Sequence, residues 1–409
     1  MSIRVAITGY SGLTSLGNDY ETIYEAMIRG ESGIRRMEDW STCENLNTEL
    51  GGPIADFDLP PEFPRKKVRS MGRVAQFSTV TTERALRQAG LIGEPIISSG
   101  DTGIAYGSSS GSPPAIADFG EMLIHNSARN ITSTSYIRMM NHTTAVNTGL
   151  FFNIRGRLIC TSTACTSGSQ AIGYAYETIK AGKQIIMVAG GAEELSITQA
   201  AVFDTLFATS TKNSEPNTTP RPFDQQRDGL VVGEGSATFI LEDLEHAKAR
   251  GATILGEVVG FGTNCDARHV TQPTAETMAI ALRSALQDAD LSERAIGYVS
   301  AHGTATELGD IAESIATSSV FGDSMPISSM KSYFGHTLGA CGSQEAWLAI
   351  EMMNRGAFAP TLNLEKVDSR CADLDYIIGE PRKIDTEYVM SNNFAFGGIN
   401  TSLILRRWR

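Results

Sequence analysis

Short apolar runs alternate with helical patterns along the chain. The runs lie near residues 104, 160, 188, 298 and 390, and each ends in small or functional residues: TGIAYG, LICTSTA, IIMVAGGA, AIGYVSAHG and YVMSNNFAF. The clearest helical pattern is 275–289, where Met278, Leu282 and Leu286 recur every four residues behind Thr274, a candidate N-cap. Strands that alternate with helices predict an α/β fold whose site lies at the ends of the strands.

Two segments predict turns or loops. In the opening IRVAITGYSGLTSLG, the glycines Gly9, Gly12 and Gly17 lack the spacing of a dinucleotide-binding motif, so we expect a short strand and a tight turn into a helix. Residues 210–223, STKNSEPNTTPRPF, have no helix or strand period and carry three prolines, which predicts a loop.

Composition narrows the class of protein. With 409 residues the chain has room for two or three domains or one duplicated fold, and its net charge of −12 argues against a nucleic-acid binder. No apolar run approaches the roughly 18 residues of a membrane span, and the N-terminus does not resemble a secretory signal, so we expect a cytoplasmic protein. The six cysteines lack CxxC spacing, which predicts neither disulfides nor a zinc site.

Cys165 is the candidate nucleophile. It lies in CTSTACTSGSQAIGYAYETIKAG, where a strand pattern stops and a helical pattern begins. A helix N-terminus favours a thiolate, yet it lowers a thiol pKa by only about one unit, so a histidine partner is needed. The competing interpretation is an inert buried cysteine, which is the usual state of a free cysteine.

Two histidines share a setting that suits such a partner. His302 in YVSAHGTATELGD and His336 in MKSYFGHTLGACG each follow an apolar run and are flanked by glycine and threonine. One such histidine is commonly structural, but two of them beside a candidate nucleophile favour a Cys/His/His site.

A serine offers a rival nucleophile. Residues 107–111, GSSSG, match the G-x-S-x-G elbow of α/β-hydrolases and would make Ser109 the nucleophile of an esterase. Pro113 and Pro114 follow at once and allow a helix only beyond them, and no HGGG-type oxyanion segment precedes the motif.

Six motifs together resemble the β-ketoacyl-[acyl-carrier-protein] synthases of the elongating type. They occur in the family's order over nearly the whole chain: TACTSG, RPFDQQRDGLVVGEG, NCDARHVTQP, HGTATELGD, KSYFGHTLGACGSQE and SNNFAFGGIN. The resemblance implies a thiolase-type α/β fold of five layers, α-β-α-β-α, made of two similar halves. The halves would be residues 1–250, with Cys165, and residues 251–409, with His302 and His336.

The same resemblance implies a reaction. Cys165 would take an acyl chain from the phosphopantetheine arm of an acyl carrier protein, and malonyl carrier protein would then lose carbon dioxide and condense with it. Neutral N–H groups of His302 and His336 would stabilise the enolate, and backbone N–H groups of Cys165 and Phe396 the oxyanion. No cofactor is expected beyond the arm that the carrier protein brings.

Further residues take supporting roles by resemblance. Lys331 and Glu313 would pair near the histidines and tune their protonation, although each alone indicates an ordinary surface ion pair. Phe396 would gate the acyl pocket. The remaining implied residues are Thr271, Thr304, Thr306 and Phe394 for substrate binding, and Glu345, Ser391 and Asn392 for a structural monovalent cation.

Departures from the family pattern point to a specialised pathway, such as polyketide or aryl-polyene assembly. Ala395 replaces a glycine, which is expected to stiffen the gating loop, and Ser300 replaces an asparagine, which weakens the cation site. The bulky Tyr333 and Phe334 are expected to reshape the pocket.

Other relatives are disfavoured. A non-catalytic partner subunit lacks the nucleophile, whereas Cys165 and both histidines are present, and a degradative thiolase needs a second cysteine where this chain has Phe396. The resemblance implies a homodimer, with a heterodimer with a related subunit as the alternative.

One basic segment stands out against the acidic whole. PRKKVRSMGR carries Arg65, Lys66, Lys67, Arg69 and Arg73 with no acidic residue between 65 and 73. A solvated helical face is the default interpretation. Because the carrier proteins of this family are acidic, we expect the segment to dock the carrier protein.

Overall fold

The same order of strands and helices occurs twice in the chain. The computed structural model describes residues 3–409. The first half consists of β1 (Val5–Leu13), α3 (Arg73–Gln88), β4 (Thr102–Gly107), α6 (Thr143–Phe152), β5 (Leu158–Thr161), α7 (Ser167–Lys180), β6 (Ile186–Glu193) and β8 (Gly235–Asp243). The second half consists of β9 (Gly256–Cys265), α10 (Ala275–Ala289), β10 (Ile296–Ser300), α11 (Glu307–Phe321), β11 (Pro326–Ser328), α13 (Cys341–Arg355), β15 (Tyr388–Ala395) and β16 (Ile399–Arg407).

The strands of the two halves have equivalent neighbours. The first half has the order β5-β4-β6-β8-β1 and the second β11-β10-β15-β16-β9, with β13 (Asp375–Tyr376) at the outer edge. In each half the first three strands in this order run parallel to one another. The fourth strand pairs antiparallel with the third, and the fifth pairs antiparallel with the fourth. Strands β1 and β9 pair through Val5–Ile7 and Gly256–Val258, which joins the halves into one eleven-stranded sheet.

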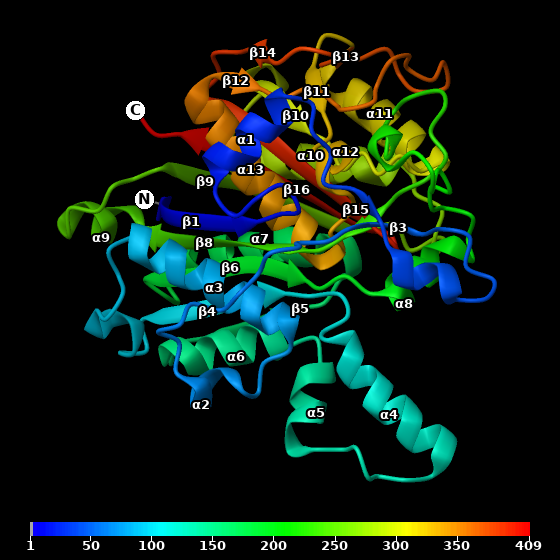
Figure 1. Cartoon of the computed structure of the whole chain (residues 1–409). Helices are drawn as coiled ribbons and strands as arrows, with labels where there is room; N and C mark the ends of the chain where they lie inside the picture. Colours follow the sequence, from blue (N-terminus) through cyan, green and yellow to red (C-terminus); the bar gives the residue numbers. More distant parts are fainter. Residues whose placement is uncertain (1–2) are drawn as a thin grey trace.

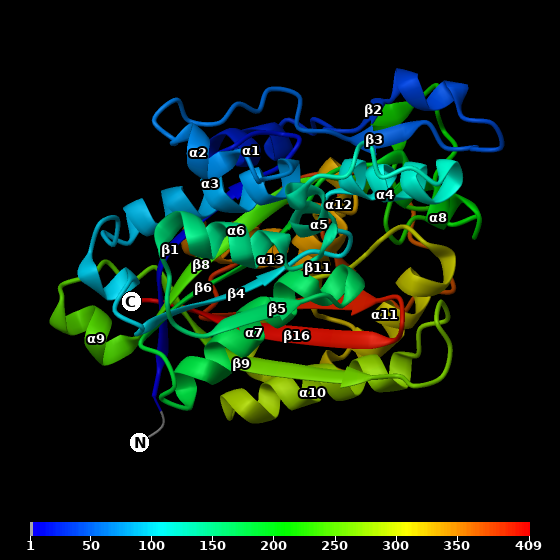
Figure 2. The same ribbon diagram turned by 90° about the horizontal axis from the view of Figure 1, so that it is seen from below.

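Helices fill the space between the halves and cover both outer faces (Figures 1 and 2). Helices α7 and α13 contact each other and strands of both halves, so they form the middle layer. Helices α3 and α6 cover the first half, and α10 and α11 cover the second. The result is five layers, α-β-α-β-α, which agrees with the expected fold. Because a middle helix meets protein on all sides, nearly all of α13 is buried.

The remaining elements connect or flank these layers. Helices α4 (Pro113–His125) and α5 (Ser133–Met139) project from the body as a hairpin (Figure 1). The others are α1 (Tyr20–Ile28), β2 (Arg35–Arg36), β3 (Leu50–Gly52), α2 (Arg65–Val68), α8 (Ile197–Asp204), β7 (Val232–Gly233), α9 (Leu244–Ala249), α12 (Lys331–Phe334), β12 (Ala357–Phe358) and β14 (Arg382–Lys383). Within residues 3–409, no helix has the length and apolar character needed to cross a membrane.

The structure confirms the predicted strands near 104, 160, 188, 298 and 390 and the helix 275–289. Thr274 is the N-cap residue, but its hydroxyl donates to Asp266 at 3.2 Å instead of capping the helix. Residues 210–223 contain only a 3-10 turn, Pro216–Thr218.

The predicted tight turn into the first helix is present at Gly17, which pairs with Thr14 just before α1, but the prediction was wrong for Gly9 and Gly12. Strand β1 runs through Gly9 and Gly12 to Leu13. A Cβ at Gly9 would lie 2.3 Å from the Ala85 carbonyl oxygen, and one at Gly12 would lie 2.2 Å from the Trp347 ring. These glycines therefore allow helices to pack closely on the strand.

Candidate active site

Cys165 lies where the middle layer meets the ends of the strands. It occupies a 3-10 turn, Ala164–Thr166, directly before α7, and Ala164 adopts the left-handed φ of 50°. The side chain is buried, with 4% exposed. The backbone N–H groups of Cys165 and Phe396 both reach its sulfur. The sequence therefore placed Cys165 at the correct end of the helix.

His336 is the direct partner of Cys165. It follows α12 and Gly335, and its backbone N–H donates to the Val231 carbonyl at 2.7 Å. Its Nε2 lies 2.9 Å from the Cys165 sulfur, and its Nδ1 accepts the Leu338 N–H at 3.3 Å. Because Nδ1 accepts, the neutral ring carries its proton on Nε2, which faces the sulfur.

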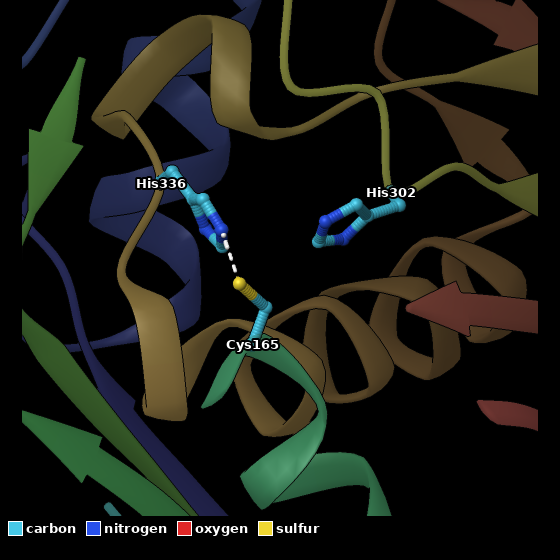
Figure 3. Close-up of side chains that lie close together, drawn as sticks. All are labelled: Cys165, His302 and His336. Carbon is cyan, nitrogen blue, oxygen red and sulfur yellow. Dashed lines mark hydrogen bonds between the residues drawn. The ribbon is translucent and has the colours of Figure 1, made fainter. Parts of the chain in front are cut away.

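His302 faces the same sulfur from the second half of the sheet (Figure 3). It follows β10, and its ring centroid lies 5.2 Å from that of His336, with the two rings nearly perpendicular. Its Nδ1 lies 3.2 Å from the Lys331 ammonium, which can only donate. The neutral His302 ring therefore also carries its proton on Nε2.

Burial sets the protonation of this cluster. Burial, and then the positive charge of Lys331, lower the pKa of both His302 and His336 well below the ordinary value of 6.5. Burial also raises the pKa of the Cys165 thiol to about 11, although Lys331 and the two N–H groups oppose this. The expected lowering by the helix was wrong for the free enzyme, because loss of solvent outweighs the dipole.

Three potential metal ligands lie close together here, but the protons on the Nε2 atoms of the two histidines make these rings hydrogen-bond donors. The sulfur of Cys165 and one nitrogen each of His302 and His336 lie within 4.8 Å of one another. A metal on either Nε2 would require a proton on Nδ1, where the Leu338 N–H or the Lys331 ammonium already donates. The pair is therefore arranged to donate to an oxygen of a substrate.

Lys331 pairs with Glu345, not with Glu313 as expected. It is fully buried, donates to a Glu345 carboxylate oxygen and to the His302 carbonyl at 2.7 Å, and approaches His302 Nδ1. Burial alone lowers the pKa of Lys331, but the Glu345 carboxylate more than offsets this and raises it. The lysine stays charged and holds the His302 ring.

Glu313 holds the backbone of the His302 loop. Its carboxylate accepts the N–H groups of His302 at 2.7 Å and Gly303 at 2.6 Å. Burial raises the pKa of Glu313 to about 8. One turn earlier on α11, Asp310 accepts the Ala305 N–H at 3.1 Å, a role that the sequence analysis missed. A G-D-x-x-E pattern just after the histidine was the available signal, since it places both carboxylates on one helix face.

The carboxylate and amide oxygens expected to hold a structural cation already accept hydrogen bonds, and the cation site stays a prediction. Both Glu345 oxygens already accept, one from Lys331 and the other from the Asn393 amide at 2.7 Å. The Asn392 side-chain oxygen accepts the Ser402 hydroxyl at 2.8 Å. Within residues 3–409 the hydroxyls of Ser391 and Ser300, register partners on β15 and β10, and the Asn393 side-chain oxygen have no hydrogen-bond partner, so these three oxygens remain open.

A cavity of about 380 Å³ leads to the three central side chains. It is lined by Thr271, Thr304, Thr306 and Phe394, which were expected to bind substrate, and by Phe396, which was expected to gate the acyl pocket. These roles stay predictions. The hydroxyls of Thr304 and Thr306 lie 2.8 Å apart, and the Phe394 ring lies 6.1 Å from that of His302.

Phe396 packs against Phe203 at a ring distance of 5.1 Å on the cavity wall. Ala395 ends β15 without a positive φ, and Gly397 and Gly398 make the left-handed turn instead. The alanine therefore fits its place without backbone strain, and the expected stiffening of the gating loop stays a prediction.

Tyr333 and Phe334 do not shape the cavity, contrary to expectation. Both are fully buried in the main core, and the Tyr333 hydroxyl donates to the Pro360 carbonyl at 2.8 Å. These bulky residues pack in the core and do not line the cavity.

Ser109 is not placed as a nucleophile. Its hydroxyl donates to the Glu193 carboxylate at 2.6 Å, and no histidine nitrogen of residues 3–409 is hydrogen-bonded to it. Helix α4 begins at Pro113 itself, earlier than expected, because proline suits the first turn of a helix. The interpretation as a serine esterase is therefore wrong.

Some basic side chains of the segment are exposed to solvent, and others are hydrogen-bonded or ion-paired within the chain. Arg65, Lys66 and Arg69 are exposed on and after α2. Lys67 instead donates to the Phe151 carbonyl at 2.5 Å, and Arg73 is paired with Glu234 at 2.7 Å. All five residues were expected to dock the carrier protein; Lys67 and Arg73 already have partners within the chain, and the docking role of the segment stays a prediction.

Known proteins share both the sequence and the fold. The model of the β-ketoacyl synthase N-terminal domain matches residues 2–247, and that of the C-terminal domain matches residues 255–365. A 3-oxoacyl-[acyl-carrier-protein] synthase 2 of Vibrio harveyi is 36% identical over 99% of this chain and 98% of its own length.

Solved structures agree over the entire chain. A β-ketoacyl synthase of Burkholderia phymatum is 61% identical with a TM-score of 0.98, and both chains are covered completely. The ishigamide ketosynthase/chain length factor is 28% identical with a TM-score of 0.91, again with complete coverage of both. The five-layered fold is thus the thiolase-like fold of the ketosynthases, and the chain belongs to the β-ketoacyl synthase family of condensing acyltransferases.

Proposed function

We propose that the protein condenses malonyl carrier protein with an acyl group held on Cys165. The observation that carries the proposal is the Cys165 sulfur facing two neutral histidines and two backbone N–H groups at the end of one cavity. The matched relatives bear the name of this activity. The pantetheine arm of the carrier protein would enter past Thr304 and Thr306.

The first half-reaction loads the enzyme. The Cys165 sulfur attacks the acyl thioester, a new carbon–sulfur bond forms, and the pantetheine thiol leaves with the proton that Cys165 gives up. The N–H group of His336 at 2.9 Å stabilises the negative sulfur as it forms.

The second half-reaction makes the carbon–carbon bond. Malonyl thioester loses carbon dioxide, and the electron pair left behind forms an enolate whose oxygen accepts the Nε2–H groups of His302 and His336. The enolate carbon attacks the acyl carbonyl, whose oxyanion accepts the N–H groups of Cys165 and Phe396. Collapse of this intermediate breaks the carbon–sulfur bond, releases the β-ketoacyl chain and leaves Cys165 as a thiolate, which takes up a proton from solvent.

A panel of acyl carrier proteins tests the proposal. Intact mass spectrometry of the wild-type enzyme is expected to show one acyl adduct, and addition of malonyl carrier protein should release carbon dioxide and the β-ketoacyl product. The adduct mass identifies the accepted chain and so separates fatty-acid elongation from polyketide or aryl-polyene assembly. An enzyme that takes up no acyl group from any carrier would refute the proposal.

Charge reversal on α2 tests docking of the carrier protein. We expect Lys66→Glu with Arg69→Glu to raise KM for carrier-bound substrate by about tenfold, because an acidic partner loses its electrostatic steering. Small thioester mimics should be unaffected. The matched control is Lys183→Glu with Arg294→Glu: both residues are exposed, and Lys183 lies beyond the end of α7 opposite Cys165. Equal effects of the two double variants, or equal effects on both substrates, would contradict docking at α2.

The edge strand β5 supports a homodimer. It is the last strand on its side of the sheet, and its Leu158 is 47% exposed. Nearby Leu150 on α6 is 71% exposed. An apolar edge strand invites pairing with a second copy about a two-fold axis.

Leu158→Lys is expected to dissociate the dimer, because a buried ammonium would face its own copy across the axis. Light scattering after gel filtration should show twice 43.9 kDa for the wild type and 43.9 kDa for the variant. The control is Ile280→Lys on α10, since Ile280 is also 47% exposed. A wild-type mass of one chain would contradict the homodimer and favour a heterodimer with a related subunit.

A further inference from the structure

Glu193 is a buried carboxylate that the proposed reaction does not use. It ends β6, is fully buried, and belongs to no ion pair within residues 3–409. Its oxygens accept from the N–H and hydroxyl of Ser109, the N–H of Ser110, the hydroxyl of Ser108, the amide of Gln199 and the N–H of Gly339, at 2.6 to 3.4 Å. A fully buried carboxyl group held only by neutral donors is rare and costly, and burial raises the pKa of Glu193 to about 7, so the group calls for a reason.

The repeat in the fold places this carboxylate opposite the active site. In the first half a 3-10 turn, Ala164–Thr166, leads into α7, and in the second half the turn Leu338–Ala340 leads into α13. Both turns start with a left-handed residue, Ala164 at 50° and Leu338 at 47°. Gly339 therefore stands where Cys165 stands, and Ser109 follows β4 as His302 follows β10. Glu193 fills this second site.

The turn that contains Gly339 also orients the ring of His336. Glu193 holds the Gly339 N–H at 3.0 Å, and the preceding residue, Leu338, donates its N–H to His336 Nδ1. The turn has no spare room, since a Cβ on Gly339 would lie 2.6 Å from both the Glu193 oxygen and the Ser109 nitrogen. A displacement of the whole Leu338–Gly339 turn would withdraw both N–H groups, including the one that keeps the proton of His336 on Nε2.

We propose that Glu193, seated in the Ser108–Ser110 turn, is a positioning residue that holds the Leu338–Gly339 turn and thereby fixes the tautomer of His336. Its catalytic consequence rests on the proposed function, in which His336 donates through Nε2. The claim that Glu193 fixes the tautomer of His336 does not rest on the proposed function, because it concerns the ring proton of the free enzyme. The GSSSG motif then serves as the cradle of this carboxylate.

Glu193→Gln is the primary test. It replaces an acceptor oxygen by an NH₂ group that faces N–H and hydroxyl donors, so the turn should shift. The matched control is Glu194→Gln: Glu194 is the next residue, is 3% exposed, and accepts from the Val74 N–H and the Ser112 hydroxyl instead. ¹⁵N spectra of histidine-labelled protein, with His336 assigned through a His336→Asn variant, report the tautomer directly.

We expect the wild type and Glu194→Gln to show His336 protonated on Nε2, and Glu193→Gln to show a mixture with Nδ1. Carbon dioxide release should fall about 10- to 100-fold in Glu193→Gln alone, as for a misplaced catalytic group. A wild-type tautomer in folded Glu193→Gln would overturn the proposal. A wild-type enzyme that releases no carbon dioxide would refute the proposed function and leave the tautomer result standing.

A variant with Ser108→Ala and Ser109→Ala covers the case in which Glu193→Gln does not fold. It removes both hydroxyl donors but keeps the carboxylate and the backbone N–H groups. We expect a smaller shift of His336 toward the Nδ1 tautomer and a smaller loss of carbon dioxide release. A wild-type tautomer together with a wild-type rate in this variant would overturn the proposal.

Discussion

Replacing Cys165 with alanine is expected to abolish acyl loading and condensation, the largest functional loss that any single substitution should cause. Both histidine rings and two backbone N–H groups face the sulfur inside the cavity. Without it no thioester can form on the enzyme, and the enolate has no electrophile to attack. The fold should survive, because alanine leaves only a small cavity at this position.

Intact mass spectrometry checks this result, with the β-ketoacyl product measured in parallel. Cys371→Ala is the control: Cys371 is also buried, but it belongs to the core under α10 and α11 rather than to the cavity. Its adduct and its product should match those of the wild type. An acyl adduct or a β-ketoacyl product from Cys165→Ala at the wild-type level would exclude Cys165 as the nucleophile.

The site could be predicted from sequence where chemistry and strand ends coincide. Cys165, His302 and His336 each stand just after an apolar run, and the fold brings those ends together because parallel strands finish at one edge of a sheet. The direction in which the pKa of the Cys165 thiol shifts could not be predicted in this way. The dipole of α7 was visible in the sequence, but the burial that outweighs it depends on residues from the other half of the fold.

The partners of buried charged side chains could not be predicted from the sequence either. Glu313 lies closer in sequence to His302 than Glu345 does, yet Glu345 meets Lys331 because α13 passes through the middle layer while Glu313 turns to backbone N–H groups. The prediction of a turn at Gly9 and Gly12 failed for a related reason. Their function is contact with Ala85 and Trp347, residues far along the chain, and turn chemistry alone cannot reveal such contacts.

His336→Ala is expected to lower carbon dioxide release from malonyl carrier protein by about 10²- to 10³-fold, which corresponds to the loss of one preorganised donor to an oxyanion. His336→Asn should retain part of the rate, because its amide N–H can still donate. Stopped-flow or radiometric measurement of carbon dioxide release gives the rate. His125→Asn on the exposed face of α4 is the control and should behave as the wild type.

The pH dependence of the same rate distinguishes neutral from charged donors. If His302 or His336 worked as an imidazolium with an ordinary pKa, the rate would fall as pH rises through 6.5. Because burial and Lys331 lower the pKa of both rings well below 6.5, the neutral Nε2–H form already dominates there, and no such fall is expected between pH 6.5 and 8. Protonation at lower pH would put a proton on each Nδ1, against the Leu338 N–H and the Lys331 ammonium. A rate that falls on raising the pH through 6.5 in the wild type, but not in His336→Asn, would show a charged donor and contradict this arrangement.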